Sequence, residues 1–255
     1  FVSWNLIGSL AGIAKEQGVN VVLNMFFGPA VNAARGIAYQ VLSKLNGFVT
    51  NFQMALNPQI IKNYASGELE NMYKLVFRGA KLSYLLLLTL SLPIVIESSL
   101  ILNLWLKEVP AYTVIFLQIT IFTALLNTLS NPLIITMHAT GKVRDYQIVV
   151  GLLSLLTLPL VYVALKMGAA PYMAMIIAFL VEFICHFARL YMLVRSIRFP
   201  MINFLRDVTL RVLIITVLSL VLPVLTYQLV DTVFLRFTMV CILSFMSTIV
   251  LGYYL

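Results

Sequence analysis

Charged side chains are scarce in this chain. Asp, Glu, Lys and Arg together make up 10% of its 255 residues, whereas hydrophobic residues make up 62%. An ordinary soluble domain carries about 25% charged residues. This deficit, together with a mean hydropathy of +1.01, excludes a typical soluble domain and predicts an all-α integral membrane protein.

Cysteines and catalytic motifs are also nearly absent from the sequence. The two cysteines, Cys185 and Cys241, fall inside apolar runs without the spacing of a disulfide or a metal site, so we interpret them as small core residues. The sequence contains no His-Glu-x-x-His, no Gly-x-Ser-x-Gly and no glycine-rich phosphate-binding loop. We therefore expect a protein that is not an enzyme and that carries no metal and no cofactor.

Long apolar runs fill most of the remaining sequence. A spanning helix needs about 20 apolar residues, and the runs predict about eight such helices with short connections. Prolines at four positions inside these runs favour kinks; they are Pro93, Pro132, Pro159 and Pro223. The expected spans are residues 3–27, 30–56, 79–105, 112–136, 146–167, 171–193, 208–229 and 233–255.

Basic residues gather on one side of the expected membrane. The other side receives only Arg35, Lys107, Lys166 and Arg236. By the positive-inside rule the richer side is cytoplasmic, so the first helix starts in the cytoplasm. Topology thus accounts for the net charge of +8, and no basic groove with interleaved aromatics predicts a nucleic-acid partner. The basic residues of the richer side are Lys62, Lys74, Arg78, Lys81, Lys142, Arg144, Arg189, Arg195, Arg198, Arg206 and Arg211.

Two polar connectors interrupt the apolar runs. We expect residues 62–81 to form a helical segment along the cytoplasmic interface, with Tyr73 and Phe77 turned toward lipid. Residues 195–207 repeat this pattern before the seventh helix. The alternative is that both connectors are simple positive-inside anchors.

Polar side chains recur every three or four residues along the expected second helix. Residues at this spacing share one face of a helix. Because an unpaired polar group in hydrocarbon is costly, we expect this face to line a wet cavity or to pack against another helix. The stripe consists of Asn32, Arg35, Tyr39, Ser43, Asn46, Thr50, Gln53 and Asn57.

The expected first helix carries a second polar face. This face includes Glu16, Asn20 and Asn24, and Lys15 lies beside Glu16. Charges at membrane depth need partners or water, and we expect Lys44 of the second helix to pair with Glu16. Two interpretations remain open: a buried pair that fixes helix packing, or a cation relay or contact with an anionic substrate.

Arg35 lies one helical turn from the outer end of the second helix. A guanidinium can bind a phosphate or carboxylate with two hydrogen bonds, and it stays charged when partly buried. Arg35 is therefore the main candidate for contact with an anionic group. The alternative is an interfacial arginine that reaches toward lipid headgroups.

Further ionisable residues lie inside the later apolar runs. Glu97 lies in the outer third of the third helix, and Glu182, His186 and Arg189 recur at helical spacing in the sixth. Such residues could form a titratable relay for ion coupling. The alternative makes Arg189 an anchor at the cytoplasmic end and Glu182 a packing partner inside the bundle.

Three sequence runs carry a resemblance to a known family. They are GVNVVLNMFFGPAVNAARGIAYQV at 18–41, FVTNFQMALNPQIIKNYASGE at 48–68 and LPIVIESSLILNLWLKEVPAYTVIF at 92–116. The Ala-Thr-Gly-Lys turn at 139–142 agrees with them. The sequence thereby resembles the second half of bacterial oligosaccharide flippases, which belong to the multidrug, oligosaccharidyl-lipid and polysaccharide exporter superfamily.

The resemblance implies a two-lobe exporter in the bacterial inner membrane. Residues 1–194 would be its second six-helix lobe, residues 195–255 a connector with two peripheral helices, and the first lobe a partner missing from this chain. The implied activity is flipping of an undecaprenyl-pyrophosphate-linked oligosaccharide by alternating access, alongside a glycan polymerase and ligase. Arg35, with Lys15 or Lys44, would neutralise the pyrophosphate, although both lysines depart from the pattern of relatives.

Three other functions remain open on the sequence. A multidrug and toxin extrusion antiporter driven by Na⁺ or protons has the same fold, but cationic drugs favour an acidic cavity, and the candidates here are net positive. A membrane glycan polymerase or ligase would be expected to carry a large outer loop, which is lacking. A passive scaffold would pack the polar stripe of the second helix dry against its neighbours.

Overall fold

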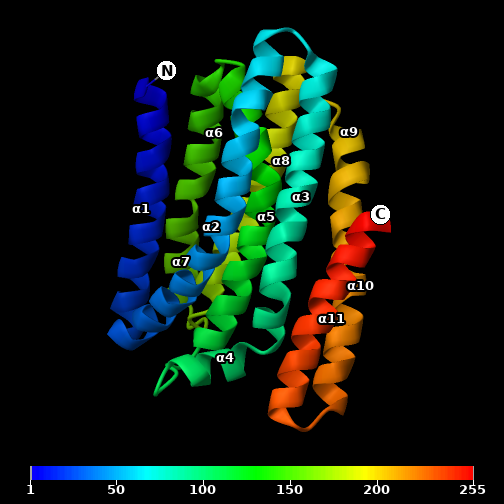
Figure 1. The fold of residues 1–255 in the computed structure, drawn as a ribbon. Helices are drawn as coiled ribbons and strands as arrows, with labels where there is room; N and C mark the ends of the chain where they lie inside the picture. The colour runs from blue at the N-terminus through cyan, green and yellow to red at the C-terminus, as the bar shows by residue number, and fades with distance from the viewer. Residues whose placement is uncertain (1, 255) are drawn as a thin grey trace.

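The computed structural model describes residues 2–254, which fold into helices joined by short turns. Successive long helices run in opposite directions between the two ends of the molecule (Figure 1). The helices are α1 (Val2–Phe27), α2 (Pro29–Ala65), α3 (Leu69–Ile96), α4 (Ser98–Trp105), α5 (Thr113–Ala139), α6 (Val143–Leu155), α7 (Thr157–Lys166), α8 (Met173–Ile197), α9 (Met201–Phe204), a π-helical turn (Leu205–Leu210), α10 (Arg211–Leu229) and α11 (Val233–Tyr254).

Six of the eight expected spans are more apolar than the other two. The prediction of an all-helical membrane protein is confirmed, because six helical segments within residues 2–254 are long and apolar enough to cross a membrane. α1 and α2 are the remaining long helices, and their polar faces keep them out of this set. The six segments are Leu69–Ile96, Thr113–Ala139, Val143–Lys166, Met173–Ile197, Met201–Leu229 and Val233–Tyr254.

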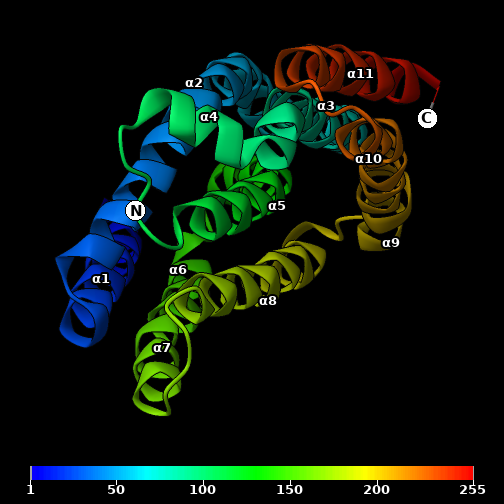
Figure 2. The same cartoon turned by 90° about the horizontal axis from the view of Figure 1, so that it is seen from below.

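α5 lies at the centre of the helix packing. It contacts α2, α3 and α8, and the view along the bundle shows it between them (Figure 2). Its side chains Leu117, Ile121 and Leu133 are fully buried. Because lipid is as apolar as leucine, such contacts stabilise the bundle through van der Waals packing.

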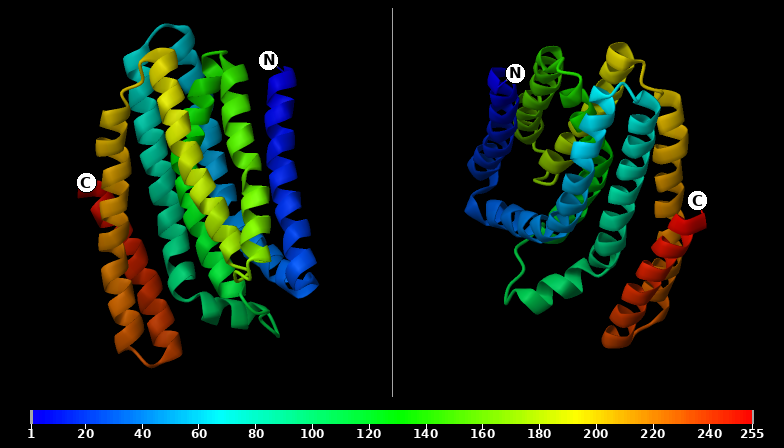
Figure 3. Two further views of the ribbon diagram at one scale, coloured as in Figure 1. Left: turned by 180° about the vertical axis from the view of Figure 1, so that it is seen from behind. Right: turned by 45° about the horizontal axis from the view of Figure 1, so that its top comes forward.

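α1 packs against α6 and α7 (Figure 3). A Cβ atom built on Gly8 would lie 2.0 Å from the side chain of Gln147, and one on Gly18 would lie 2.4 Å from Leu158. Small residues let helix backbones approach closely in membranes. Gly18 therefore lets α1 lie close to Leu158 of α7, whereas the amide end of Gln147 could move away from a side chain at position 8.

α10 and α11 pack together and against α3. The Tyr84 hydroxyl of α3 lies 2.9 Å from the Thr216 hydroxyl of α10, and the Thr89 hydroxyl donates to Thr248 of α11 at 3.0 Å. Hydrogen bonds between helices in a membrane each contribute about 0.6–2 kcal/mol. The last two helices are thus held to α3 by polar as well as apolar contacts.

Two of the four prolines expected to kink the spanning helices coincide with breaks. α3 ends three residues after Pro93, and α6 gives way to α7 two residues before Pro159. Proline removes one backbone hydrogen bond of the helix, so the series of backbone hydrogen bonds along the helix is interrupted near these points. α5 and α10, by contrast, continue through Pro132 and Pro223.

The predicted interfacial connector at residues 62–81 is wrong. α2 continues to Ala65, and α3 begins at Leu69 after a tight turn, so these residues are the adjoining ends of two antiparallel helices. Lys62 and Lys74 are exposed at these helix ends. Lysines at the ends of spanning helices already reach water, so their presence does not require a separate helix along the membrane surface. The prediction took these charges as evidence for such a helix.

Tyr73 and Phe77 do not face lipid alone, contrary to the prediction. The Tyr73 hydroxyl donates a 2.7 Å hydrogen bond to the backbone oxygen of Ile197. Phe77 packs edge to face against Phe199 and Phe204, with ring centroids 5.9 and 5.4 Å apart. Phe199 and Phe204 are buried, so the second predicted connector, residues 195–207, is held to the bundle by these two aromatic side chains.

The segment before α10 contains a π-helical turn. α9, the π-helical turn Leu205–Leu210 and α10 form one continuous rod. A π-helical turn is rare and occurs mostly as a single turn inside an α-helix. The seventh span therefore begins at Met201, not at residue 208.

Candidate functional site

A cavity of about 440 Å³ lies between α1, α2, α5 and α8. It brings together predicted polar residues from helices that are far apart in the sequence, and we call it the Arg35 cavity. A cavity of this size suits a small molecule or the polar part of a larger one. Its lining residues are Ser9, Gly12, Ile13, Lys15, Glu16, Val19, Arg35, Tyr39, Thr123, Asn127, Met175, Ala178 and Glu182.

Arg35 is a buried cation on the wall of this cavity. Its side chain comes from α2, and the residue is only 4% exposed. One guanidinium nitrogen donates to Asn20 Oδ1 and another to the Tyr39 hydroxyl at 3.3 Å, while the guanidinium carbon lies 4.6 Å from the Tyr39 ring centre. Among residues 2–254, no carboxylate lies within ion-pair distance of Arg35, and its Nε is buried without a partner.

The turn between α1 and α2 positions Arg35. Gly28 adopts a φ of +76°, a conformation that other residues rarely take, and Pro29 follows as the first residue of α2. This turn folds the start of α2 back along α1, where Asn32 Nδ2 donates to the backbone oxygen of Asn20 at 3.0 Å. Asn20 thus contacts both Asn32 and Arg35 and ties the two helices together.

Glu182 of α8 binds two cations from different helices. Arg189 Nη1 donates to its Oε1 at 2.7 Å, and Lys15 Nζ of α1 lies 3.5 Å from its Oε2. The side chains of Glu182 and Arg189 are 9% and 8% exposed, whereas that of Lys15 is 24% exposed. The carboxylate is therefore neutralised by two cations of the same chain, and Lys15 reaches it from the cavity side.

Arg189 and His186 of α8, the sixth expected helix, are both buried inside the bundle. Arg189 is buried against Glu182, so the prediction that it is a cytoplasmic-end anchor is wrong. The prediction erred because helical position alone does not show that a carboxylate lies within reach. His186 is 1% exposed, and its Nδ1 lies 2.7 Å from the Ser130 hydroxyl of α5.

Glu16 and Lys44 do not meet, contrary to the prediction. Glu16 is exposed on the wall of the Arg35 cavity, and within the described chain it makes no ion pair. Lys44 lines a different cavity on another side of α2. The two residues lie on helices that do meet, but their faces point in different directions.

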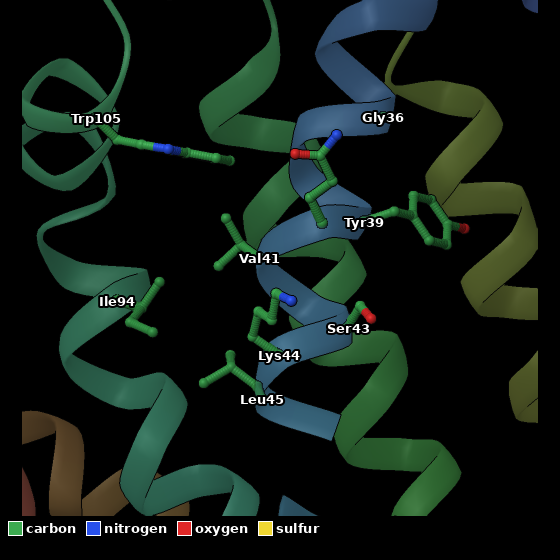
Figure 4. A pocket seen from close by; sticks show the side chains of 9 residues that line it. Gly36, Tyr39, Val41, Ser43, Lys44, Leu45, Ile94 and Trp105 are labelled. Atoms are coloured by element: carbon green, nitrogen blue, oxygen red, sulfur yellow. The ribbon is translucent and has the colours of Figure 1, made fainter. Parts of the chain in front are cut away.

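The second cavity, of about 640 Å³, lies between α2 and the α3–α4 segment. Trp105 at the end of α4 reaches toward α2 above Val41 and Ile94, and Lys44 lies below it (Figure 4). We call this space the Trp105 cavity. Its lining residues are Gly36, Tyr39, Gln40, Val41, Ser43, Lys44, Leu45, Ile94 and Trp105.

A comparison with known families decides the class of the protein. A sequence model of the MatE family matches residues 17–163, which is more than half of the chain. The chain belongs to the MatE family. MatE proteins are membrane transporters rather than enzymes, and they fall within the exporter superfamily named above. No curated protein and no solved structure matches this MatE chain.

The remaining ion-coupling candidate of this MatE protein lies away from both cavities. Glu97, at the break between α3 and α4, is 2% exposed. Arg236 of α11 binds both of its oxygens, at 2.6 and 3.2 Å, and also lies 4.6 Å from the Tyr227 ring centre. In this position Glu97 connects α11 to the rest of the bundle.

The polar stripe of α2 divides along its length. Its outer part, at Arg35 and Tyr39, lines the Arg35 cavity, whereas Gln53 is buried against α5. Gln53 Nε2 donates to the backbone oxygen of Thr128 at 3.4 Å, and Asn131 Nδ2 donates to Gln53 Oε1 at 3.0 Å. The other predicted cavity residues of α1 and α2 line neither cavity; they are Asn20, Asn24, Asn32, Asn46, Thr50 and Asn57.

Sequence reasoning missed several residues that line the cavities, four of which carry polar or aromatic side chains from α2, α4 and α5. Thr123 and Asn127 of α5 line the Arg35 cavity, and Gln40 and Trp105 line the Trp105 cavity. Thr123 and Asn127 are four residues apart inside an apolar run, and this spacing is a detectable polar face. Within residues 2–254, no cluster of three His, Cys, Asp or Glu side chains could hold a metal.

Proposed function

We propose that this MatE protein flips an undecaprenyl-pyrophosphate-linked oligosaccharide across the bacterial inner membrane by alternating access, together with a first lobe outside this chain. Export would then pass substrate to a glycan polymerase and ligase. The observation that carries the proposal is Arg35. Buried charges are normally paired, and in the described chain no carboxylate lies within ion-pair distance of this guanidinium, although Glu16 and Glu182 line the same cavity.

The buried charge of Arg35 supports an anionic substrate, and of the two carboxylates on the wall of the Arg35 cavity only Glu16 lacks an ion pair within the described chain. Glu182 already binds Arg189 and Lys15, so its charge does not attract a cationic drug. The Nε of Arg35 is buried and has no hydrogen-bond partner. A pyrophosphate supplies the acceptor oxygens that a guanidinium binds best.

The test is complementation of a flippase-deficient bacterium with the full-length protein. Surface glycan and intracellular lipid-linked repeat units are measured together, with a matched repeat unit and verified membrane expression. We expect the wild-type protein to restore surface glycan and to lower the precursor, and Arg35→Ala to do neither at equal expression. Normal export by Arg35→Ala would overturn the role of Arg35, and no export by the wild-type protein would overturn the proposed function.

One observation favours a second function, an ion-coupled drug antiporter. Glu16 is exposed on the wall of the Arg35 cavity and makes no ion pair within residues 2–254. Such a carboxylate can bind a cation or a proton. Efflux of a cationic dye that requires Na⁺ or a proton gradient, and that Glu16→Gln abolishes, would support the antiporter over the flippase.

A further inference from the structure

The Trp105 cavity combines three kinds of side chain on two helices. The indole of Trp105 offers a broad apolar face, Gln40 and Ser43 offer neutral hydrogen-bonding groups, and Lys44 offers an ammonium. Trp105 is 52% exposed, and in the described chain none of these four side chains has a hydrogen-bond partner. The groups are thus free to bind a molecule that enters the cavity.

This combination matches the chemistry of a sugar. A pyranose ring presents C–H groups on its faces and hydroxyls around its edge, so it stacks on an indole while its edge bonds to amides and hydroxyls. Ligand sites typically pair apolar surface with a few placed polar groups in a volume of about 300–1,000 Å³. The Trp105 cavity, at about 640 Å³, has both features.

The two cavities lie on either side of one helix and share a residue. Tyr39 lines both the Arg35 cavity and the Trp105 cavity. Lys44 follows Arg35 by nine residues on α2, which corresponds to about 13 Å along the helix and to its opposite face. An elongated ligand with an anionic group at one end could therefore contact both cavities around Tyr39.

We propose that the Trp105 cavity is a subsite for the sugar part of the substrate, with Trp105 as the stacking platform and Gln40 as a hydrogen-bonding partner. The inference rests on the proposed function, in which Arg35 binds the pyrophosphate of the same molecule. Recognition then has two parts: the Arg35 cavity binds what all lipid-linked repeat units share, and the Trp105 cavity binds what distinguishes them.

The test measures binding of two probes to the purified full-length protein in detergent. One probe is undecaprenyl pyrophosphate carrying the repeat oligosaccharide, extracted from the strain that encodes the protein; the other is undecaprenyl pyrophosphate without sugar. We expect Trp105→Ala to weaken binding of the sugar-bearing probe about tenfold and to leave the sugar-free probe unchanged. Trp105→Phe keeps a stacking face and should retain most of the affinity, whereas Arg35→Ala should weaken both probes.

Matched controls separate the possible failures. Leu104→Ala changes the neighbouring residue of α4, which is 76% exposed and outside the cavity, and should affect neither probe. If Trp105→Ala does not fold, Gln40→Ala on α2 should give the same selective loss. An equal loss for both probes would make Trp105 a contact for the lipid or its headgroup, and no loss for either would also overturn the subsite. Failure of the wild-type protein to bind either probe would instead overturn the proposed function.

Discussion

Glu182 holds one deeply buried cation and one cation at a cavity wall. Arg189 is 8% exposed and bonded at 2.7 Å, whereas Lys15 is 24% exposed at 3.5 Å. Removing one member of a buried ion pair leaves the other charge without compensation, while removing a partly hydrated partner costs less. The two contacts should therefore respond very differently to substitution.

Glu182→Gln should destabilise the protein by about 3–5 kcal/mol, because Arg189 would remain buried without a carboxylate. Lys15→Ala should destabilise it much less. Thermal unfolding of the purified protein in detergent measures both effects. The double variant Glu182→Gln/Arg189→Gln should recover part of the loss, and equal destabilisation by Lys15→Ala and Glu182→Gln would contradict the arrangement.

Asn20→Asp should abolish export while preserving the fold. The substitution changes only one amide to a carboxylate, and its oxygen already accepts from Arg35. The new carboxylate would neutralise the guanidinium that the proposed function assigns to the pyrophosphate. Surface glycan in the complementation assay should fall as far as it does for Arg35→Ala, with an unchanged melting temperature. Export at the wild-type level by Asn20→Asp would show that the charge of Arg35 is not needed.

Individual residues of the site could be predicted from sequence, but their partners could not. The three- and four-residue spacing placed Arg35 and Tyr39 on one face of α2, and both line the Arg35 cavity. The pairing of Glu16 with Lys44 failed because helical periodicity gives the direction of a side chain on its own helix only. The contact of Lys15 with Glu182 joins residues 167 positions apart, and it depends on how α1 and α8 are arranged in space.

At the scale of elements, α1 depends on a small residue where it meets α7. Gly18→Val should lower the free energy of unfolding by about 1–3 kcal/mol, because a Cβ atom there would lie 2.4 Å from Leu158. Gly12→Val is the matched control on the same helix, since no atom lies within 4 Å of a Cβ built on Gly12. Thermal unfolding compares the two variants. Equal stability of Gly12→Val and Gly18→Val would show that α1 can shift away from α7 without cost.

The ends of the elements were harder to predict than their existence. Apolar runs located α5, α8 and α11 to within a few residues. The sequence around the α2–α3 turn misled the prediction because its charges were taken to mark a surface segment. Lys62 and Lys74 are exposed, but Met72 and Val76, on either side of Lys74, are buried. The end of a helix can extend past the apolar core of the membrane and still pack one face against the bundle. The number of charged residues in the segment does not show whether it does so.

At the scale of the whole molecule, we propose that residues 1–194 form the transport lobe and residues 195–255 an attached pair of helices. α10 and α11 pack on α3, on the side of the bundle opposite α1 (Figure 2). The contact between Glu97 and Arg236 and the hydrogen bonds of Tyr84 and Thr89 join the pair to α3. Neither cavity takes a residue from α10 or α11.

The orientation of the whole molecule can be tested by labelling. The α2–α3 and α5–α6 turns lie at one end of the molecule and the α7–α8 turn at the other (Figure 1). In a variant without native cysteines, a membrane-impermeant maleimide applied to intact cells should label Met167→Cys. It should label Ser66→Cys and Lys142→Cys only after lysis, because the positive-inside rule places those turns in the cytoplasm. The reverse pattern would invert the topology.

The π-helical turn at Leu205–Leu210 bears on how this protein tolerates changes in length. Such a turn takes up one more residue than an α-helical turn over the same rise. The π-helical turn therefore contains one residue more than an α-helical turn would need at this place. With that extra residue present, α10 is rotated so that Thr216 faces Tyr84. Deletion of one residue within the π-helical turn would give an ordinary α-helix and keep the contacts of α10 with α3. Deletion of one residue within α10, before Thr216, would instead rotate the Thr216 hydroxyl away from Tyr84.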